Sequence, residues 1–170
     1  MAILKYLGGT YRTFGELPAV GSYAPDFSLV NTELQDVSLA NFMGKRKVLN
    51  IFVSIDRPVC GKSCMEFDRL AESNDDIAML MVSYDLPFAH SRFAQLNELK
   101  HVIGLSAIRH AGFGENYGVQ IVDGPLAGMF SRAIVVLDEN NTVVYHEHIQ
   151  DITNEPDYGA ALRALGINGE

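Results

Sequence analysis

Apolar residues along this chain come in short runs that alternate with segments of helical spacing. Residues 47–54 and 77–82 are apolar on both faces, as expected of buried strands in the centre of a sheet. Residues 59–73 and 87–99, which follow these two runs, carry their apolar side chains at helical intervals. A strand–helix–strand–helix order predicts an α/β fold.

Both ends of the chain predict hairpins. Residues 3–7 and 10–14 are β-prone runs on either side of Gly8-Gly9. Residues 131–137 and 142–148 are also strand-like, and the polar turn between them makes this the strongest hairpin signal in the sequence. The remaining expected elements are shorter: an apolar run at 27–30, a helical turn at 38–42, a strand at 102–105, a helix at 112–117 and an amphipathic helix at 156–165.

These elements predict a mixed central sheet flanked by helices, with an N-terminal β-hairpin. We expect one domain over residues 1–170, of which residues 1–20 are the hairpin extension. The order fits a thioredoxin-like core, although periodicity alone does not separate that core from other α/β folds.

Composition excludes several classes of protein. Hydrophobic residues make up 48% of the chain, which supplies a core and argues against disorder. The net charge of −8 repels phosphate backbones, so we expect no nucleic-acid partner. No apolar run has the length of a membrane span, and the first residues do not read as a signal peptide. We therefore expect a cytoplasmic protein with no membrane association.

Two cysteines, Cys60 and Cys64, are the main candidates for chemistry. Cys60 stands where a predicted buried strand gives way to a helix, two residues after Pro58, so it falls in the first helical turn. Free backbone N–H groups at a helix start favour an anion, and the thiolate is the reactive form of cysteine. The alternative is a buried core cysteine, and position alone does not decide between the two.

Metal binding is a weaker interpretation of the cysteine pair. No second pair exists, and the five histidines have no matching spacing, so we expect neither metal nor cofactor. His146 and His148 would share one strand face, where we expect them to be solvated. The spacing from Cys60 to Cys64 also differs from the Cys-x-x-Cys motif of thioredoxin, which disfavours a disulfide reductase.

The segment that ends in Asp56-Arg57-Pro58-Val59-Cys60 resembles the active-site segment of the Tpx-type thiol peroxidases, a bacterial branch of the peroxiredoxins. The resemblance runs in order through nearly the whole chain from about Gly21. It is carried by residues 45–60, 85–93, 117–119, 123–128, 131–140 and 153–158. Matching segments in the same order are far more specific than one cysteine motif.

This resemblance implies a thioredoxin fold and the reduction of hydroperoxides. The family's peroxidatic cysteine maps to Cys60, and its catalytic arginine, which holds the thiolate and the peroxide oxygens, maps to Arg132. The resemblance also implies organic hydroperoxides as substrates, thioredoxin or another thiol as reductant, and a homodimer. A guanidinium suits the role assigned to Arg132 because its several N–H groups can stabilise the charge on the leaving oxygen.

Three positions depart from the family pattern. Val53 replaces the usual proline, and Arg57 replaces the threonine or serine whose hydroxyl bonds the thiolate and the peroxide. Arg57 favours the thiolate through its charge but is long enough to obstruct the pocket. Ala94 occupies the position of the usual resolving cysteine, so the usual disulfide of the branch cannot form.

Cys64 offers a substitute for the resolving cysteine. Residues four apart on a helix have Cβ atoms about 5–6 Å apart, whereas a disulfide needs about 3.5–4.5 Å, so the first turn would have to unwind. A small core residue is the alternative for Cys64. Two functions follow: a thiol-dependent peroxidase, or a weakened or silenced peroxiredoxin-like protein that acts as a thiol redox sensor or interaction module.

Overall fold

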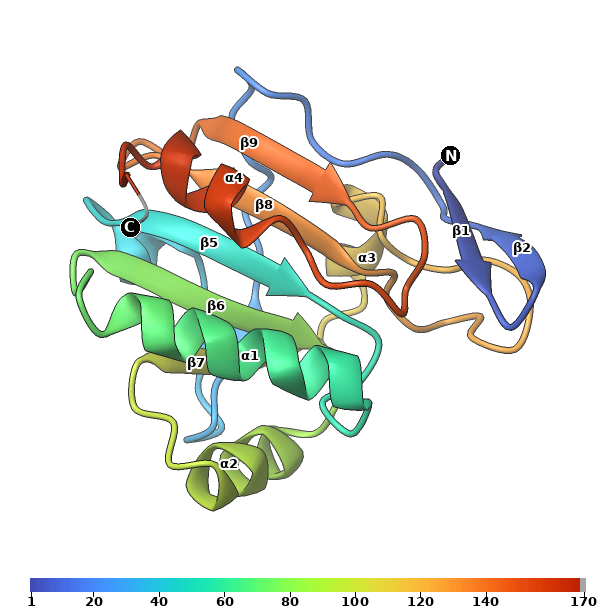
Figure 1. Ribbon diagram of the computed structural model, residues 1–170, viewed down its shortest axis with the longest axis horizontal. Helices are drawn as coiled ribbons and strands as arrows, with labels where there is room; N and C mark the ends of the chain where they lie inside the picture. The colour runs from blue at the N-terminus through green and yellow to red at the C-terminus, as the bar shows by residue number, and fades with distance from the viewer. Residues whose placement is uncertain (169–170) are drawn as a thin grey trace.

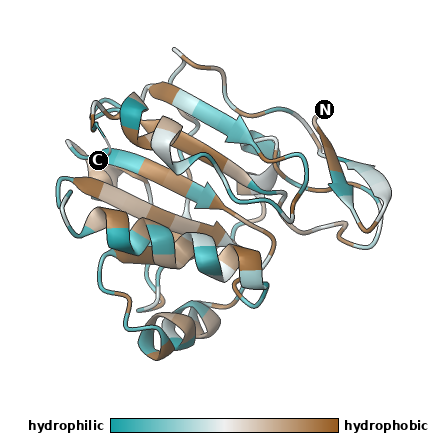
Figure 2. Cartoon of the chain, viewed as in Figure 1, coloured by the Kyte–Doolittle hydropathy of each residue, from teal (hydrophilic) through white to brown (hydrophobic). Residues whose placement is uncertain are grey.

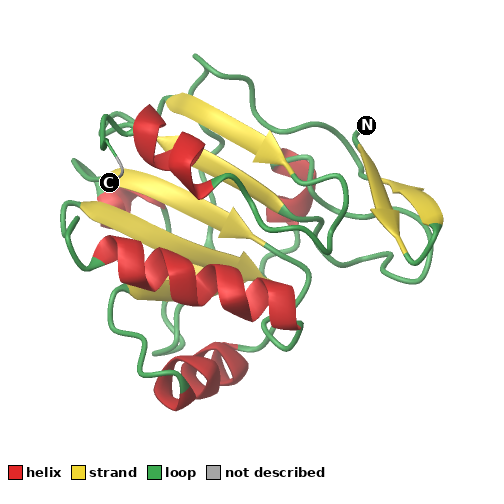
Figure 3. Cartoon of the chain, viewed as in Figure 1, coloured by secondary structure: helices red, strands yellow, loops and turns green. Residues whose placement is uncertain are grey.

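The computed structural model describes residues 1–168 and has a mixed seven-stranded sheet covered by helices on both faces (Figures 1 and 3). The three central strands β5 (Arg46–Ile51), β6 (Ile77–Ser83) and β7 (Val102–Ser106) are parallel, and the outer strands join them antiparallel. The spatial order is β4 (Asp36–Val37), β3 (Leu29–Val30), β7 (Val102–Ser106), β6 (Ile77–Ser83), β5 (Arg46–Ile51), β8 (Ala133–Leu137) and β9 (Val143–His148).

Three helices pack on one face of the sheet: α1 (Pro58–Ala71), α2 (Pro87–Leu96) and α4 (Tyr158–Ala164). The opposite face is covered by α3 (Gly112–Asn116), the 3₁₀ turn η1 (Leu39–Phe42) and part of the N-terminal connection. Because β5, β6 and β7 are linked through α1 and α2, the carboxyl ends of β5 and β6 lie together at one edge of the sheet, at the right of Figure 1.

The core follows the predicted hydrophobic pattern. Every residue of β6 is buried, and five of the six residues of β5 are buried too. In Figure 2 the inner strands β6 and β8 are mostly brown and α1 carries teal patches on its outer face, whereas the edge strand β9 is largely teal. Each fully buried large apolar side chain contributes roughly 1.5–3 kcal/mol, so these two strands anchor the loops that leave their carboxyl ends.

The N-terminal hairpin is confirmed as β1 (Ile3–Tyr6) and β2 (Gly9–Arg12). Gly8 has φ +77° in its turn, a conformation that favours glycine. Some boundaries differ from the prediction: β8 begins at Ala133 rather than residue 131, and α2 ends at Leu96 rather than residue 99. The sequence did not predict β4, which is only two residues long.

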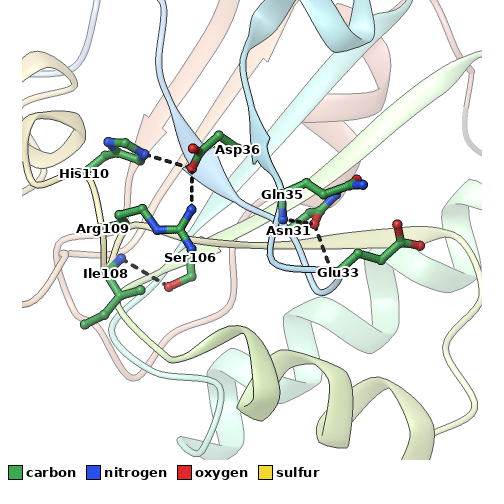
Figure 4. Close-up of polar contacts among 8 residues, drawn as sticks. All are labelled: Asn31, Glu33, Gln35, Asp36, Ser106, Ile108, Arg109 and His110. Atoms are coloured by element: carbon green, nitrogen blue, oxygen red, sulfur yellow. Dashed lines mark hydrogen bonds and ion pairs between the residues drawn. The ribbon is translucent and has the colours of Figure 1, made fainter.

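Side-chain hydrogen bonds fix the short β3–β4 edge (Figure 4). Asn31 Oδ1 accepts from the backbone N–H groups of Glu33 and Gln35, both at 3.0 Å, which shapes the turn between the strands. Asp36 accepts from Arg109 Nη1 at 3.1 Å and lies 2.9 Å from His110 Nε2, and His110 is the main cause of the lowered Asp36 pKa. These contacts tie the edge hairpin to the segment that follows β7.

Candidate active site

The loop after β5 places Cys60 in the first turn of α1. Arg57 is the N-cap residue, with extended backbone angles, and Pro58 occupies the first helical position, where a missing N–H costs nothing. The Cys60 N–H donates to the Arg57 carbonyl at 3.0 Å, and the thiol is fully buried. The structure therefore places the thiol of Cys60 at the N-terminal end of α1, which is the positive end of the helix dipole.

Asp85, after β6, holds this loop in place. Its carboxylate accepts from Ser54 Oγ at 2.8 Å, from the Ile55 N–H at 2.7 Å and from Ser83 Oγ at 2.6 Å. The Ser83 hydroxyl also lies 3.0 Å from Nε2 of His90, whose pKa burial lowers to about 4. Asp85 lies within residues 85–93 of the family resemblance, but the sequence did not predict that it anchors this loop.

Arg132 stands just before β8, the strand that pairs with β5, and is fully buried. Its Nη1 donates to the carbonyl of Ile152 at 3.3 Å and to that of Asn154. Its Nε and Nη2 have no acceptor among the described residues. Burial lowers the Arg132 pKa, and the nearby Cys60 sulfur is the largest opposing influence. The structure thus brings a buried guanidinium with free donors close to the candidate nucleophile.

The N-terminal hairpin supports the segment that holds Arg132. The backbones of Lys5 and Asp151 form an isolated parallel β-bridge. The Lys5 N–H donates to the Gln150 carbonyl at 2.6 Å, and the Lys5 carbonyl accepts from the Ile152 N–H at 3.4 Å. Because Ile152 offers its own carbonyl to Arg132, the hairpin is part of the framework of the site.

Two of the three positions that depart from the family pattern, Val53 and Arg57, face this hairpin. Val53 packs in an apolar cluster with Leu4, Ile121 and Ile152 and keeps an apolar wall. The Arg57 guanidinium lies over the Tyr6 ring, 5.2 Å from its centroid, and its Nη1 is buried with no acceptor among residues 1–168. The Arg57 charge also contributes to the lowered Arg132 pKa, so the two guanidiniums lie close enough to repel.

Cys64 lies one turn further along the unbroken helix α1, and both cysteines are free thiols. It is buried, and Asn50 Nδ2 approaches its sulfur at 3.9 Å while donating to Ser63 Oγ at 3.0 Å. Burial raises the pKa of the Cys64 thiol well above its usual value, and a neighbouring Cys60 charge adds to that rise. In this arrangement Cys64 is a protonated, poorly nucleophilic thiol.

Two hollows adjoin helix α1. A cavity of about 390 Å³ opens at the start of α1 and is lined by Ile55, Asp56, Arg57, Pro58, Gly61, Lys62, Met65 and Phe93. A larger one of about 510 Å³ lies between α1, α2 and β7, and its lining includes both Cys64 and Ala94. The lining of the first hollow includes residues of the helix start but not Cys60, whose thiol is buried.

The histidines do not assemble into a metal site. Within residues 1–168, no group of three or more His, Cys, Asp or Glu side chains could hold a metal ion. The prediction that His146 and His148 are solvated was wrong, because both are half-buried and bonded within the fold. His146 Nδ1 lies 2.8 Å from the Pro18 carbonyl, and His148 Nε2 lies 2.9 Å from Ser131 Oγ. In the same part of the chain, no helix has the length and apolarity needed to cross a membrane.

The sequence of this chain matches one family model and is similar to curated proteins. The model of the Redoxin family matches residues 19–162. Two curated proteins named thiol peroxidase, from Mycobacterium bovis and Mycobacterium tuberculosis, are each 47% identical over 166 residues, covering 98% of this chain and 99% of theirs.

Solved structures agree with the sequence comparison. A peroxiredoxin-like protein from Aquifex aeolicus superposes with a TM-score of 0.90 at 28% identity. A thiol peroxidase from Chromobacterium violaceum does so with a TM-score of 0.89 at 26% identity. Each match covers 96% of this chain and 95% of the other, so the predicted thioredoxin-like peroxiredoxin fold is confirmed.

Proposed function

The chain belongs to the Redoxin family, and from that premise we propose that it is a thiol-dependent peroxidase that reduces hydrogen peroxide and organic hydroperoxides in antioxidant defence. The observation that carries the proposal is the pairing of a cysteine in a first helical turn with a buried arginine, two of whose donor atoms are free among the described residues. Cys60 supplies the nucleophile, and Arg132 supplies positive charge, with Nε and Nη2 lacking an acceptor in that part of the chain.

The reaction uses the Cys60 thiolate and the peroxide O–O bond. The sulfur attacks the outer oxygen, an S–O bond forms, and the O–O bond breaks to release an alkoxide that takes up a proton as the alcohol. Sulfur is oxidised to the sulfenic acid while the peroxide is reduced. A thiol then condenses with the sulfenic acid to give a disulfide and water, and a second thiol restores Cys60.

Arg132 stabilises the charge that moves from sulfur to the leaving oxygen. Its guanidinium is fixed through Nη1 by the carbonyls of Ile152 and Asn154, so the remaining donors need no reorientation during the reaction. Fixed donors in a buried site act in a low dielectric, where they stabilise developing charge more than they would in water. Because Arg57 stands where the family has threonine, the hydroxyl that would bond the thiolate and the peroxide is missing, which affects the rate of the reaction. The stabilisation of the leaving oxygen by Arg132 does not depend on that hydroxyl.

The regeneration step has two routes in this chain. Cys64 resolves Cys60 within the same helix if the first turn of α1 unwinds, and otherwise an external thiol such as thioredoxin attacks directly. Burial and the raised pKa of Cys64 slow the internal route in the folded arrangement. Unwinding breaks a few backbone hydrogen bonds, each worth roughly 0.5–1.5 kcal/mol, and exposes Cys64 at the same time.

We also propose that the protein works as a single-domain homodimer in the cytoplasm. The family implies the dimer, and the composition argues for the compartment. Size-exclusion chromatography with light scattering measures the oligomeric state directly. A mass of 18.7 kDa, that of one chain, across micromolar concentrations would contradict the homodimer.

A peroxide-consumption assay tests the function. The reduced protein is supplied with thioredoxin and its reductase, or with dithiothreitol, and hydrogen peroxide loss is followed with time. The wild type should consume peroxide, Cys60→Ser should lose all turnover, and Cys64→Ser should keep the first oxidation. Consumption by Cys60→Ser equal to that of the wild type would refute the assignment of the nucleophile.

A further inference from the structure

The ring of Phe93 packs on the first turn of α1, against the residue that follows Cys60. An ideal Cβ built on Gly61 would lie 2.9 Å from both Cε2 and Cζ of this ring, closer than Cβ atoms normally approach, so the ring rests directly on the Gly61 backbone. Phe93 belongs to α2 and is half-buried, and it also packs against the apolar cluster that contains Cys60 and Cys64. Helix α2 therefore holds the turn that carries the nucleophile.

The same ring stands between the two hollows that adjoin α1. The two linings have Ile55 and Phe93 in common. The smaller hollow reaches the first turn at Pro58 and Gly61, and the larger one reaches Cys64 one turn further along the helix. Phe93 thus lies between the turn that must unwind and the space beside the second cysteine.

The contact with Phe93 differs in kind from the polar bonds of the turn. The Cys60 N–H donates to the Arg57 carbonyl at 3.0 Å, and the Cys60 carbonyl accepts from Ser63 Oγ at 2.8 Å. When the turn unwinds, water can take the place of these partners, so each bond restrains the turn only modestly. The apolar contact between the ring and the turn has no such replacement in water, so its loss opposes unwinding.

From this geometry we propose that Phe93 controls the fate of oxidised Cys60: it holds the first turn of α1 wound, so that Cys64 captures the sulfenic acid slowly. The inference rests on the proposed peroxidase function and adds to it a residue that sets how the sulfenic acid is resolved. With the turn unwound, the Cys64 sulfur attacks the Cys60 sulfur, the S–O bond breaks, and a disulfide and water form. With the turn wound and no external thiol present, a second hydrogen peroxide oxidises the sulfenic acid to the sulfinic acid and is itself reduced to water.

The test measures how the sulfenic acid divides between these two products. The reduced protein is treated with a large excess of hydrogen peroxide in the absence of other thiols. Intact-mass spectrometry then compares the disulfide, which has lost two hydrogens, with the sulfinic acid, which has gained two oxygens. Phe93→Ala should raise the ratio of disulfide to sulfinic acid about tenfold, and Phe93→Leu, which keeps an apolar side chain on the turn, should raise it less. The rate constant for the first oxidation of Cys60 should stay within about threefold of wild type, because Arg132 is untouched.

Phe88→Ala is the matched control, because Phe88 is a phenylalanine of the same helix that is 66% exposed. Asp68→Asn, which weakens the half of α1 away from Cys60, controls for a general loss of stability. Both variants should keep the wild-type ratio. In a Cys64→Ser background, Phe93→Ala should leave the rate of sulfinic acid formation within about twofold, because no second thiol is there to capture the sulfenic acid.

Three results would overturn the proposal: an unchanged ratio in both Phe93 variants, an equal rise in either control, or a changed rate of sulfinic acid formation when Phe93→Ala is combined with Cys64→Ser. If Cys60 is oxidised but none of the proteins forms the disulfide, this inference fails while the peroxidase function stands. If peroxide does not oxidise Cys60 at all, the proposed function fails and the role of Phe93 falls with it.

Discussion

Replacing Asp85 by asparagine should loosen the loop that delivers Cys60 to α1. The amide can keep its oxygen toward the Ile55 N–H and Ser83 Oγ and turn its NH₂ group toward Ser54 Oγ, so the three contacts survive without the charge. A hydrogen bond to an ionised group contributes about 1.5–3 kcal/mol and a neutral one about 0.5–1.5 kcal/mol, so the three together lose about 3 kcal/mol. Partial exposure of Asp85 to solvent reduces the expected loss to about 2 kcal/mol.

The assay for Asp85→Asn combines two readouts on the reduced protein. Urea unfolding at pH 7 should show the loss of about 2 kcal/mol in the free energy of unfolding. The second-order rate constant for oxidation of Cys60 by hydrogen peroxide should fall at least tenfold, because a small displacement of the nucleophile from its donors costs much of the rate.

Asp68→Asn is the control for this reasoning. Asp68 Oδ1 accepts from the backbone N–H groups of Lys100, His101 and Val102 at 3.0, 2.7 and 3.0 Å, in the half of α1 away from Cys60. Its replacement should cost comparable stability and leave the oxidation rate within about twofold of wild type. Equal slowing in both variants, or no slowing in Asp85→Asn, would refute the claim that Asp85 positions the nucleophile.

Two further predictions follow from the buried polar groups. Arg132→Met should slow the oxidation of Cys60 about a hundredfold or more while lowering the free energy of unfolding by under about 2 kcal/mol, because its lost donors Nε and Nη2 have no acceptor within residues 1–168. A rate that falls only as far as the stability does would contradict the catalytic role. His90, with its folded-state pKa lowered to about 4 by burial, binds fewer protons folded than unfolded between about pH 4 and 6.5, so stability should fall as pH drops through that window. Urea unfolding of the wild type and of His90→Gln should show that His90 accounts for roughly 2–3 kcal/mol of the stability lost between pH 7 and 4.5. If the stability of His90→Gln depends on pH as steeply as that of the wild type, His90 is not the cause.

The sequence predicted the principal helices and strands because the strongest signals in the chain are local. The buried runs of β5 and β6 and the helical spacing of α1 depend on neighbours in sequence, and all three elements lie where predicted, within a few residues. The placement of Cys60 in the first turn also follows from a local signal, the break at Pro58.

The missed features depend on contacts between distant segments. Ser131 was expected to begin β8, but its N–H donates to the Val119 carbonyl at 2.8 Å and the strand starts two residues later. The role of Asp85 arises because two loops some 30 positions apart meet at the carboxyl ends of adjacent strands. The position of Arg57 over Tyr6 depends in the same way on where the N-terminal hairpin docks.

The central claim is that Cys60 is the peroxidatic cysteine, whose sulfur is oxidised by the peroxide. Its most direct test is intact-mass spectrometry of the reduced protein after one equivalent of hydrogen peroxide. The wild type should lose two hydrogens through a Cys60–Cys64 disulfide, and Cys64→Ser should instead gain one oxygen that peptide mapping assigns to Cys60. Cys60→Ser should keep its mass. A wild type that does not react, or a Cys60→Ser protein that is oxidised as fast as the wild type, would contradict the account.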